Sequence, residues 1–417
     1  MRQLNPGVGG ETVTEPLNIA VLSIHSSPIG TLGTGDTGGM SIYLLELVRA
    51  LAERGHKIDI FTRVLVRGDA PLIEYGSRIR IIQLQVPGTE NLVKNKLFGY
   101  LPDYQREIDK FCQQQHASYH IVHSNYWLSA VVGDSLQSTW GCPHLITFHT
   151  LARFKMAARQ DHVENPLRVE EESRLLARCD GVMVATATER DQLATLAESA
   201  KTPVHLVPLG VDFDRFKPLP DAVEKVTRSR RRPPVILFVG RFDPMKGVDT
   251  AVKALALLDE EIEPELHLVG GDSPESEAEA RLVSLVGDLG LQGRVRFNGS
   301  VDHQRMPEMY RQADIVVVPS YYESFGLVVL EALASGIPAA VTPTGIAVET
   351  IIPDLNGYFA AIGDSRSLAR AMTDALALAR HQDPFLIRRS VQCYDWCRVA
   401  DLVFSVYSGA LLRSETC

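Results

Sequence analysis

The chain has few of the features that mark a secreted, membrane-spanning or nucleic-acid-binding protein. Its six cysteines are scattered over 417 residues without a C-x-x-C pair, which is typical of free thiols in a reducing cytoplasm. No apolar run approaches the roughly 18 residues of a membrane span, and the formal net charge of −9 gives no basic surface for nucleic acid. We therefore expect a cytoplasmic protein with small-molecule partners, no nucleic acid and no integral membrane segment. Its oligomeric state stays open, with a homodimer as one option.

Signals of cofactor-dependent nucleotide chemistry are also missing. The run Ile58–Arg63 reads as a strand but ends without an acidic residue, which a dinucleotide-binding fold uses to hold ribose. A D-x-D motif, Asp212 to Asp214, resembles a metal–nucleotide clamp, but it falls in a predicted connection and not at the end of a strand that faces a cleft. We therefore expect neither NAD nor a metal that bridges a diphosphate, and no cofactor that catalysis would require.

The chain does have two series of short β-branched runs that alternate with amphipathic segments, one beginning at Leu17 and the other at Val235. Such alternation predicts parallel sheets with helices on both faces. We predict an α/β fold of two doubly wound, Rossmann-like domains facing a central cleft, where the carboxyl ends of the strands would bind ligands. The expected divisions are a flexible tail over 1–16, domains over 17–212 and 213–393, and a C-terminal helix over 394–417 that crosses back to the first domain.

The most informative segment runs from Glu323 to Glu331. Ile315–Pro319 reads as a buried strand and Phe325–Ala334 as the helix after it. The N–H groups at a helix start favour an anion, and Gly326 would let the backbone approach it closely. The second carboxylate lies about 7–9 Å along the helix axis from the first turn.

This spacing suits a sugar diphosphate. The diphosphate would rest on the helix start, with Glu323 holding hydroxyls of the sugar and Glu331 those of the ribose. The alternative is a surface Glu323 and a Glu331 paired with a core arginine. Glu331 is flanked by Val-Val-Leu and Ala-Leu-Ala, where an ionised side chain is costly without a dedicated partner.

Two cations follow the first strand of the second series. Arg241 and Lys246 could neutralise a departing diphosphate, although a surface lysine and a core-pairing arginine would give the same pattern. In the first series, His149 ends the strand His144–Phe148, where side chains face a cleft, but a lone histidine is more often structural. The glycine-rich loop Gly33–Gly39 opens onto a helix and could pass close to a phosphate, or form a tight turn.

Two motifs together resemble one enzyme family. E-S-F-G-x-x-x-x-E, from Glu323 to Glu331, and G-R-x-x-x-x-K, from Gly240 to Lys246, are similar to the signatures of retaining GT-B glycosyltransferases of glycosyltransferase family 4. The resemblance implies a hexosyltransferase whose first domain binds the acceptor and whose second binds a UDP-sugar. It also implies retention of configuration without a carboxylate nucleophile, the leaving phosphate taking the acceptor proton.

Four sequence segments are similar to those of a branch of this family that transfers N-acetylglucosamine from UDP-N-acetylglucosamine to an inositol phosphate. They are His25–Pro28, Gly35–Met40, His123–Ser129 and Thr147–Ala152. The chain departs from the family at Ser41, where the family has Asn. The side chain that would contact the acceptor ring is therefore shorter and ends in a hydroxyl. The acceptor therefore stays open between inositol phosphate and fructose 6-phosphate, which relatives that make sucrose phosphate use. The donor sugar stays open between glucose and N-acetylglucosamine.

The resemblance also implies roles for single residues. The implied catalytic residues are His149, Arg241, Lys246 and Glu323. The implied donor site contains the last three together with His25, Gly38, Gly39, Val301, Ser324, Phe325, Gly326, Leu327 and Glu331. The implied acceptor site is Asp36, Ser41, Lys94, Tyr126, Thr150 and Arg168. The last four offer two cations and two hydroxyls to a phosphate dianion. A non-catalytic magnesium ion, which some relatives bind, would lie near Tyr310, Arg311 and Ala313.

Two other classes of function fit the same architecture. A sugar-nucleotide epimerase would need cleft acids and bases that move a proton, and a phosphorylase usually carries a lysine-bound pyridoxal phosphate; neither pattern is visible in the sequence. A non-catalytic nucleotide-binding protein would be expected to lack at least one of Glu323, Arg241 and Lys246, and all three are present. We therefore expect an enzyme.

Overall fold

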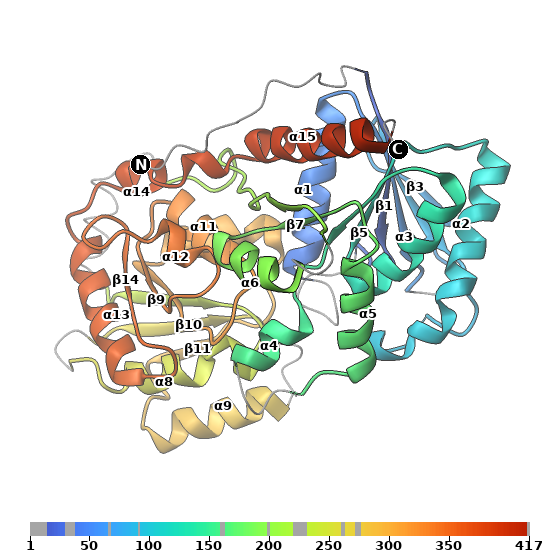
Figure 1. Ribbon diagram of the computed structural model, residues 1–417. Helices are drawn as coiled ribbons and strands as arrows, with labels where there is room; N and C mark the ends of the chain where they lie inside the picture. Colours follow the sequence, from blue (N-terminus) through green and yellow to red (C-terminus); the bar gives the residue numbers. More distant parts are fainter. Residues whose placement is uncertain are drawn as a thin grey trace.

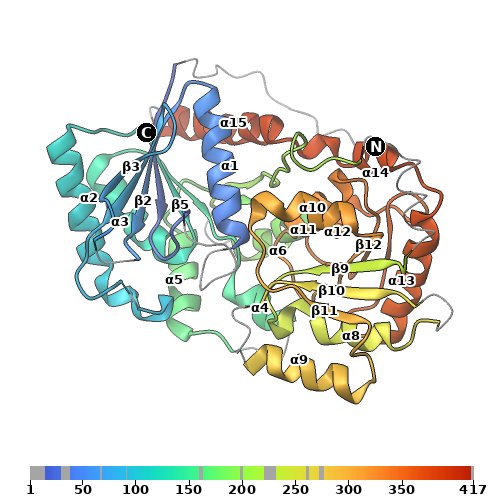
Figure 2. The same ribbon diagram turned by 180° about the vertical axis from the view of Figure 1, so that it is seen from behind.

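Two sheets, each with helices packed against it, lie side by side in the molecule (Figure 1, Figure 2). The computed structural model describes residues 15–29, 38–65, 68–90, 92–158, 163–197, 201–219, 232–259, 263–271 and 277–414. Its five described cysteines are free thiols, and Cys417 lies outside these ranges. Among the described helices, none is both long and apolar enough to cross a bilayer.

The first sheet has eight strands in the order β3-β4-β2-β1-β5-β6-β7-β8. Their bounds are β1 (Asn18–Ser23), β2 (Lys57–Arg63), β3 (Leu72–Glu74), β4 (Ile79–Leu84), β5 (Ile121–Asn125), β6 (His144–Thr147), β7 (Gly181–Val184) and β8 (Val204–Leu206). All neighbours are parallel except β3, which runs antiparallel to β4 at one edge. The sequence predicted β1, β2, β4, β5 and β6 but not β3, β7 and β8, whose three or four residues show little of a hydrophobic period.

Helices cover this sheet on both faces (Figure 1). They are α1 (Gly39–Glu53), α2 (Leu101–Gln115), α3 (Trp127–Trp140), α4 (Ala152–Ala158), α5 (Pro166–Leu176) and α6 (Ala187–Ala197). In α1 the predicted apolar stripe is confirmed, because Leu44, Leu47, Val48 and Leu51 are buried. Gly55 follows the helix with φ 95°, a left-handed conformation typical of a helix end.

The second sheet has six parallel strands in the order β11-β10-β9-β12-β13-β14. Their bounds are β9 (Val235–Val239), β10 (Glu265–Val269), β11 (Val295–Phe297), β12 (Ile315–Val318), β13 (Ala339–Val341) and β14 (Gly357–Phe359). The helices of this half are α8 (Val248–Leu255), α9 (Glu277–Asp288), α10 (Met306–Gln312), α11 (Leu327–Ala334), α12 (Ala347–Thr350), α13 (Ser365–Ala379) and α14 (Pro384–Arg389). The predicted helix Gln304–Gln312 begins with a separate 3-10 turn, His303–Arg305.

The last helix, α15 (Trp396–Ser414), lies against α1 of the first half (Figure 1, Figure 2). Arg54, at the end of α1, pairs with Asp401, with 2.7 Å between Nε and Oδ1. The buried Tyr407 hydroxyl lies 2.8 Å from Nδ1 of His123 in β5. The chain thus returns to the first sheet after completing the second, whereas the domain limits at 212 and 393 stay predictions.

Candidate functional site

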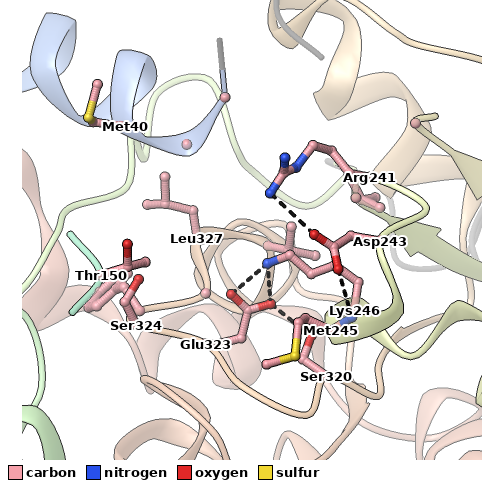
Figure 3. A pocket seen from close by; sticks show the side chains of 18 of the residues that line it. Met40, Thr150, Arg241, Asp243, Met245, Lys246, Ser320, Glu323, Ser324 and Leu327 are labelled. Carbon is pink, nitrogen blue, oxygen red and sulfur yellow. Dashed lines mark hydrogen bonds and ion pairs between the residues drawn. The ribbon is translucent and has the colours of Figure 1, made fainter. Parts of the chain in front are cut away.

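A cavity of about 680 Å³ is lined by both halves of the molecule. Its lining residues follow the carboxyl ends of parallel strands: His25 comes after β1, Tyr126 after β5, Arg241 after β9 and Val301 after β11. Figure 3 shows Met40 and Thr150, from the first half, across from Arg241 and Lys246 of the second. The cavity therefore lies where two doubly wound sheets are expected to bind a ligand.

Most of the site residues predicted from the sequence line this cavity. They are His25, Gly38, Gly39, Lys94, Tyr126, His149, Thr150, Arg168, Arg241, Lys246, Val301, Glu323, Ser324, Phe325, Gly326, Leu327 and Glu331. Ser41 is not among the lining residues: it is buried, and its hydroxyl donates to the Ser27 carbonyl oxygen at 3.4 Å. Asp36 lies outside the described residues.

Glu323 and Lys246 form an ion pair at the floor of the cavity (Figure 3). Nζ of Lys246 lies 2.7 and 2.8 Å from the two carboxylate oxygens, and the Ser320 hydroxyl donates to Oε1 at 2.8 Å. The sequence had treated these residues as separate ligands of sugar and phosphate. An ammonium group has three N–H donors, so the lysine can keep this pair and still donate to a phosphate.

Arg241 is held more loosely. Its guanidinium lies 3.7 Å from Asp243, and half of its side chain is exposed. Asp243 in turn accepts a hydrogen bond from the Met245 N–H at 2.8 Å, which fixes the 3-10 turn Pro244–Lys246 after β9. The alternative considered from the sequence, a surface lysine and a core-paired arginine, is wrong, because the arginine is the exposed partner and the lysine the enclosed one.

The start of α11 is shaped by two glycines. Gly326 precedes the helix with φ 99°, a conformation that other residues rarely adopt. Gly345 lies close by, and a Cβ there would come within 2.1 Å of the Phe325 carbonyl oxygen. Within the described part of the chain, the N–H groups of Ser324, Phe325 and Gly326 donate no hydrogen bond. These donors, at the positive end of the helix dipole, are available to an anion.

Glu331 lies one turn further into α11 and has a partner on each oxygen. Nε2 of His303 is 2.7 Å from Oε1, and the Tyr310 hydroxyl donates to Oε2 at 2.7 Å. Burial, and then the adjacent carboxylate, raise the pKa of Tyr310 well above its ordinary value, so this hydroxyl stays protonated. The buried acid therefore has dedicated partners, a histidine and a tyrosine, and not the core arginine of the alternative considered from the sequence. Each oxygen keeps a lone pair for a further donor.

Arg168 organises part of the lining that comes from the first half. Its Nε donates to Glu172 at 2.6 Å, and Nη1 donates to Glu164 at 3.1 Å. Nη2 donates to both the carbonyl and the hydroxyl oxygen of Thr150, at 2.6 and 3.1 Å. The guanidinium also lies over the Tyr126 ring, 5.0 Å from its centroid. The guanidinium is therefore fixed in position, with its charge shared between two carboxylates.

Two buried histidines complete the lining. Burial lowers the pKa of His149 to about 3, and its Nε2 lies 2.9 Å from Oδ1 of Asn125. Burial, and then the nearby Lys94, lower the pKa of His25 well below its ordinary value. Both rings are therefore neutral at physiological pH. His149 has φ 60° and Tyr126 φ 75°, backbone conformations that persist at functional sites when the surroundings enforce them.

Several lining residues were missed by sequence reasoning. They are Lys155, Glu164, Asp243, His303 and Tyr322. Asp243 and Tyr322 lie within or beside quoted motifs, so proximity could have indicated them. Lys155 pairs with Glu164 at 2.7 Å, and no local sequence pattern predicts this pairing.

The residues near the expected magnesium position are part of the second half's core. Tyr310 and Ala313 are buried, and the Tyr310 hydroxyl is engaged with Glu331. None of Tyr310, Arg311 and Ala313 offers the carboxylate that Mg²⁺ usually takes. In the described parts of the chain, no group of three His, Cys, Asp or Glu side chains could hold a metal. The ion stays an expectation from the resemblance.

Comparison with known proteins covers nearly the whole chain. The family "Glycosyl transferases group 1" matches residues 221–385, and the "Glycosyl transferase 4-like domain" matches residues 38–210. The D-inositol 3-phosphate glycosyltransferase of Xylanimonas cellulosilytica is 35% identical over 95% of this chain and 97% of its own length. That of Mycolicibacterium smegmatis is 32% identical over 95% and 92%.

Solved structures agree. Sucrose-phosphate synthase from Thermosynechococcus elongatus superposes with a TM-score of 0.86 at 31% identity, covering 95% of this chain and all of the other. Anabaena HepE, solved in complex with UDP and glucose, superposes with a TM-score of 0.68 at 19% identity, covering 94% and all of the other, and shares the fold. Likeness at this level over both halves identifies the chain as a GT-B glycosyltransferase, a hexosyltransferase belonging to the glycosyl transferases group 1 and 4-like families.

Proposed function

We propose that this enzyme transfers glucose or N-acetylglucosamine from a UDP-sugar to a small phosphorylated polyol such as an inositol phosphate, with retention of configuration. The observation that carries the proposal is the cavity itself. From the second half it presents unpaired N–H groups and Lys246, beside a pair of carboxylates, and from the first half it presents Lys94 and Arg168. A sugar diphosphate could bind to the first set of groups, and the phosphate of a separate acceptor could bind to the second.

The donor end supports a sugar nucleotide. The N–H groups at the start of α11 and the free donor of Lys246 suit a diphosphate, Glu331 suits the ribose, and Glu323 suits the transferred sugar. In this proposal the Val301 backbone contacts the base, since Val301 lines the cavity two residues before His303, which contacts Glu331. The HepE structures with UDP and glucose and with UDP-glucose agree with this choice of donor.

The acceptor end supports a phosphorylated polyol. Lys94, Lys155 and Arg168 bring three cations to it, against the carboxylates of Glu164 and Glu172. A phosphate dianion can bind between cations whose geometry is already fixed. The names of the curated relatives favour inositol phosphate.

Retention would follow from attack on the face that the diphosphate leaves. The acceptor oxygen forms a bond to the anomeric carbon as the bond to the β-phosphate oxygen breaks, and that oxygen takes the acceptor proton. Arg241, Lys246 and the start of α11 stabilise the charge that develops on the diphosphate. Neutral His149 can donate a hydrogen bond to the sugar but carries no charge.

The test is UDP release from UDP-glucose or UDP-N-acetylglucosamine with inositol 3-phosphate, fructose 6-phosphate, inositol and fructose as acceptors. We expect release that needs a phosphorylated acceptor. Lys94→Gln should raise KM for that acceptor about 10- to 100-fold, as expected for a lost charged hydrogen bond. Lys96→Gln is the matched control, because Lys96 lies in the same 3-10 turn but not on the cavity.

The outcomes separate the parts of the proposal. No UDP release with any pair would contradict it, and equal rates with inositol and inositol 3-phosphate would remove the acceptor-phosphate site. Preference for fructose 6-phosphate would favour the second candidate, sucrose-phosphate synthesis, which the sucrose-phosphate synthase structure at 31% identity supports.

A further inference from the structure

Arg215 lies outside the cavity but contacts a residue that lines it. It belongs to the segment that leads from the first half to the second, and its Nη2 donates to Nδ1 of His303. The other nitrogen of that ring, Nε2, lies 2.7 Å from Oε1 of Glu331. A continuous path of hydrogen bonds therefore joins the connecting segment to the buried acid of α11.

Arg215 and Glu331 favour the same tautomer of His303. Nη2 of Arg215 lies nearer to Nδ1 of the ring than to Nε2, which is 3.4 Å away. A guanidinium can only donate hydrogen bonds, so Nδ1 must be the acceptor. The ring proton is then on Nε2, where it is donated to the Glu331 carboxylate. Without Arg215 the Nδ1 side of the ring would lose the donor that holds it, and only the Glu331 carboxylate would then select the tautomer and orientation of the ring.

The segment that carries Arg215 is firmly anchored. Arg388 of α14 donates to the carbonyl oxygens of Phe213, at 2.7 Å, and of Phe216. It also donates at 2.9 Å to the Ala334 carbonyl oxygen, at the end of α11. The guanidinium of Arg215 lies over the fully buried ring of Phe216, 5.1 Å from its centroid. Arg215 is thus fixed relative to the helix that carries Glu331.

Arg215 also reaches the first half of the molecule. Its Nη1 lies 3.7 Å from Oε1 of Glu46 in α1, the helix whose first residue, Gly39, lines the cavity. Glu46 is shared with Arg49, at 2.9 Å. Arg49 therefore provides a matched control: it pairs with the same carboxylate, but its other hydrogen-bond partner is the Tyr75 hydroxyl and not His303.

We propose that Arg215 is a positioning residue for the donor ribose, because by holding His303 as the Nε2–H tautomer it orients Glu331 to accept hydrogen bonds from ribose hydroxyls. This inference rests on the proposed function, in which Glu331 binds the ribose. Arg215 touches no substrate itself. Its removal should therefore affect ligands that carry the hydroxyls and spare ligands that lack them.

The test is calorimetric binding of UDP, 2′-deoxy-UDP and 3′-deoxy-UDP. The intact protein should bind UDP at least about tenfold more tightly than one of the deoxy analogues, as expected for a hydrogen bond to a charged group. Arg215→Gln should reduce this ratio to about twofold or less, mainly by weakening UDP, and Arg49→Gln should leave the ratio unchanged. Arg215→Lys, which keeps the charge beside Glu46 but loses the planar fork, should also lose the ratio and serves if the first variant does not fold.

A double-mutant comparison sharpens the test. In a His303→Gln background, Arg215→Gln should change the ratio no further, because the residue through which it acts is gone. Equal weakening of all three nucleotides by Arg215→Gln would overturn the inference, since this is what a general structural role predicts. If both Arg215 variants keep the preference for UDP over the deoxy analogues, the inference is wrong. UDP binding and the proposed function would not be affected by that result. Failure of the intact protein to bind UDP would instead refute the proposed function and this inference together.

Discussion

At the scale of residues, the site is a set of charges that are already paired before any ligand arrives. Lys246 is held by both oxygens of Glu323, and Arg168 is held by Glu172 and Thr150. Such pairing fixes long side chains in one conformation, so less conformational entropy is lost when a ligand binds. It also makes each member of a pair depend on the other.

Lys246→Gln tests the pair at the donor end. We expect kcat to fall about 100- to 1,000-fold, the usual effect of removing one group that stabilises developing negative charge. Arg241→Gln should reduce kcat less, because that side chain is half exposed and only loosely held. Steady-state UDP release, with circular dichroism to confirm folding, measures both. A lysine variant within about twofold of the intact enzyme would contradict this account of the leaving group.

The sequence predicted the residues of the site better than it predicted the side chains with which they pair. Glu323, Glu331, Arg241 and Lys246 lie in motifs whose spacing could be tied to a strand end and a helix start. The pairing of Lys246 with Glu323 spans 77 residues and depends on how two loops meet, which no local pattern specifies. The histidine beside Glu331 was missed for the same reason.

At the scale of elements, the short strands and their crossover helices fix where the loops emerge. Helix α3 illustrates how tightly the first half is packed. A Cβ on its Gly133 would lie 2.3 Å from both Nε2 of His144 and Oγ of Ser124, two buried groups that are themselves 2.8 Å apart. The glycine is therefore needed for the helix to approach β5 and β6.

Gly133→Ala should lower the free energy of unfolding by about 1–3 kcal/mol, the cost of an overpacked core. Gly287→Ala is the matched control, because this glycine also lies in a helix, α9, but is exposed and meets only the Gln292 side chain, at 3.8 Å. We expect that change to be neutral or to stabilise by up to about 1 kcal/mol. Urea denaturation of both variants gives the comparison, and equal stability of the two would show that the helix can shift to make room.

The elements that the sequence missed share a physical reason. Strands β7, β8, β13 and β14 have three or four residues each, fewer than a hydrophobic period needs to be recognised. Longer runs such as Lys57–Arg63, in which every residue after the first is buried, and the stripe of α1 were predictable because burial imposes their pattern. Boundaries differed by up to three residues, as at the end of α8, which was expected at Leu258 and lies at Leu255, because the turns at helix and strand ends depend on tertiary contacts.

At the scale of the whole molecule, two sheets present their carboxyl ends to one cavity, and the chain is tied together on the far side by α15. The alternation of strands and helices predicted the two halves. The return of the last helix to α1 was expected from its apolar face alone, and its contacts, such as Arg54 with Asp401, join residues more than 300 positions apart. The cavity requires both halves, because neither lines the donor and acceptor ends alone.

The central claim is that a sugar nucleotide binds with its diphosphate on the start of α11 and its ribose at Glu331. A crystal structure of the protein with UDP tests it most directly. The account predicts phosphate oxygens within hydrogen-bonding distance of the N–H groups at Ser324–Leu327 and of Lys246 Nζ, with a ribose hydroxyl on the Glu331 carboxylate. Ordered UDP at any other position, or in this cavity with its diphosphate away from α11, would contradict the account.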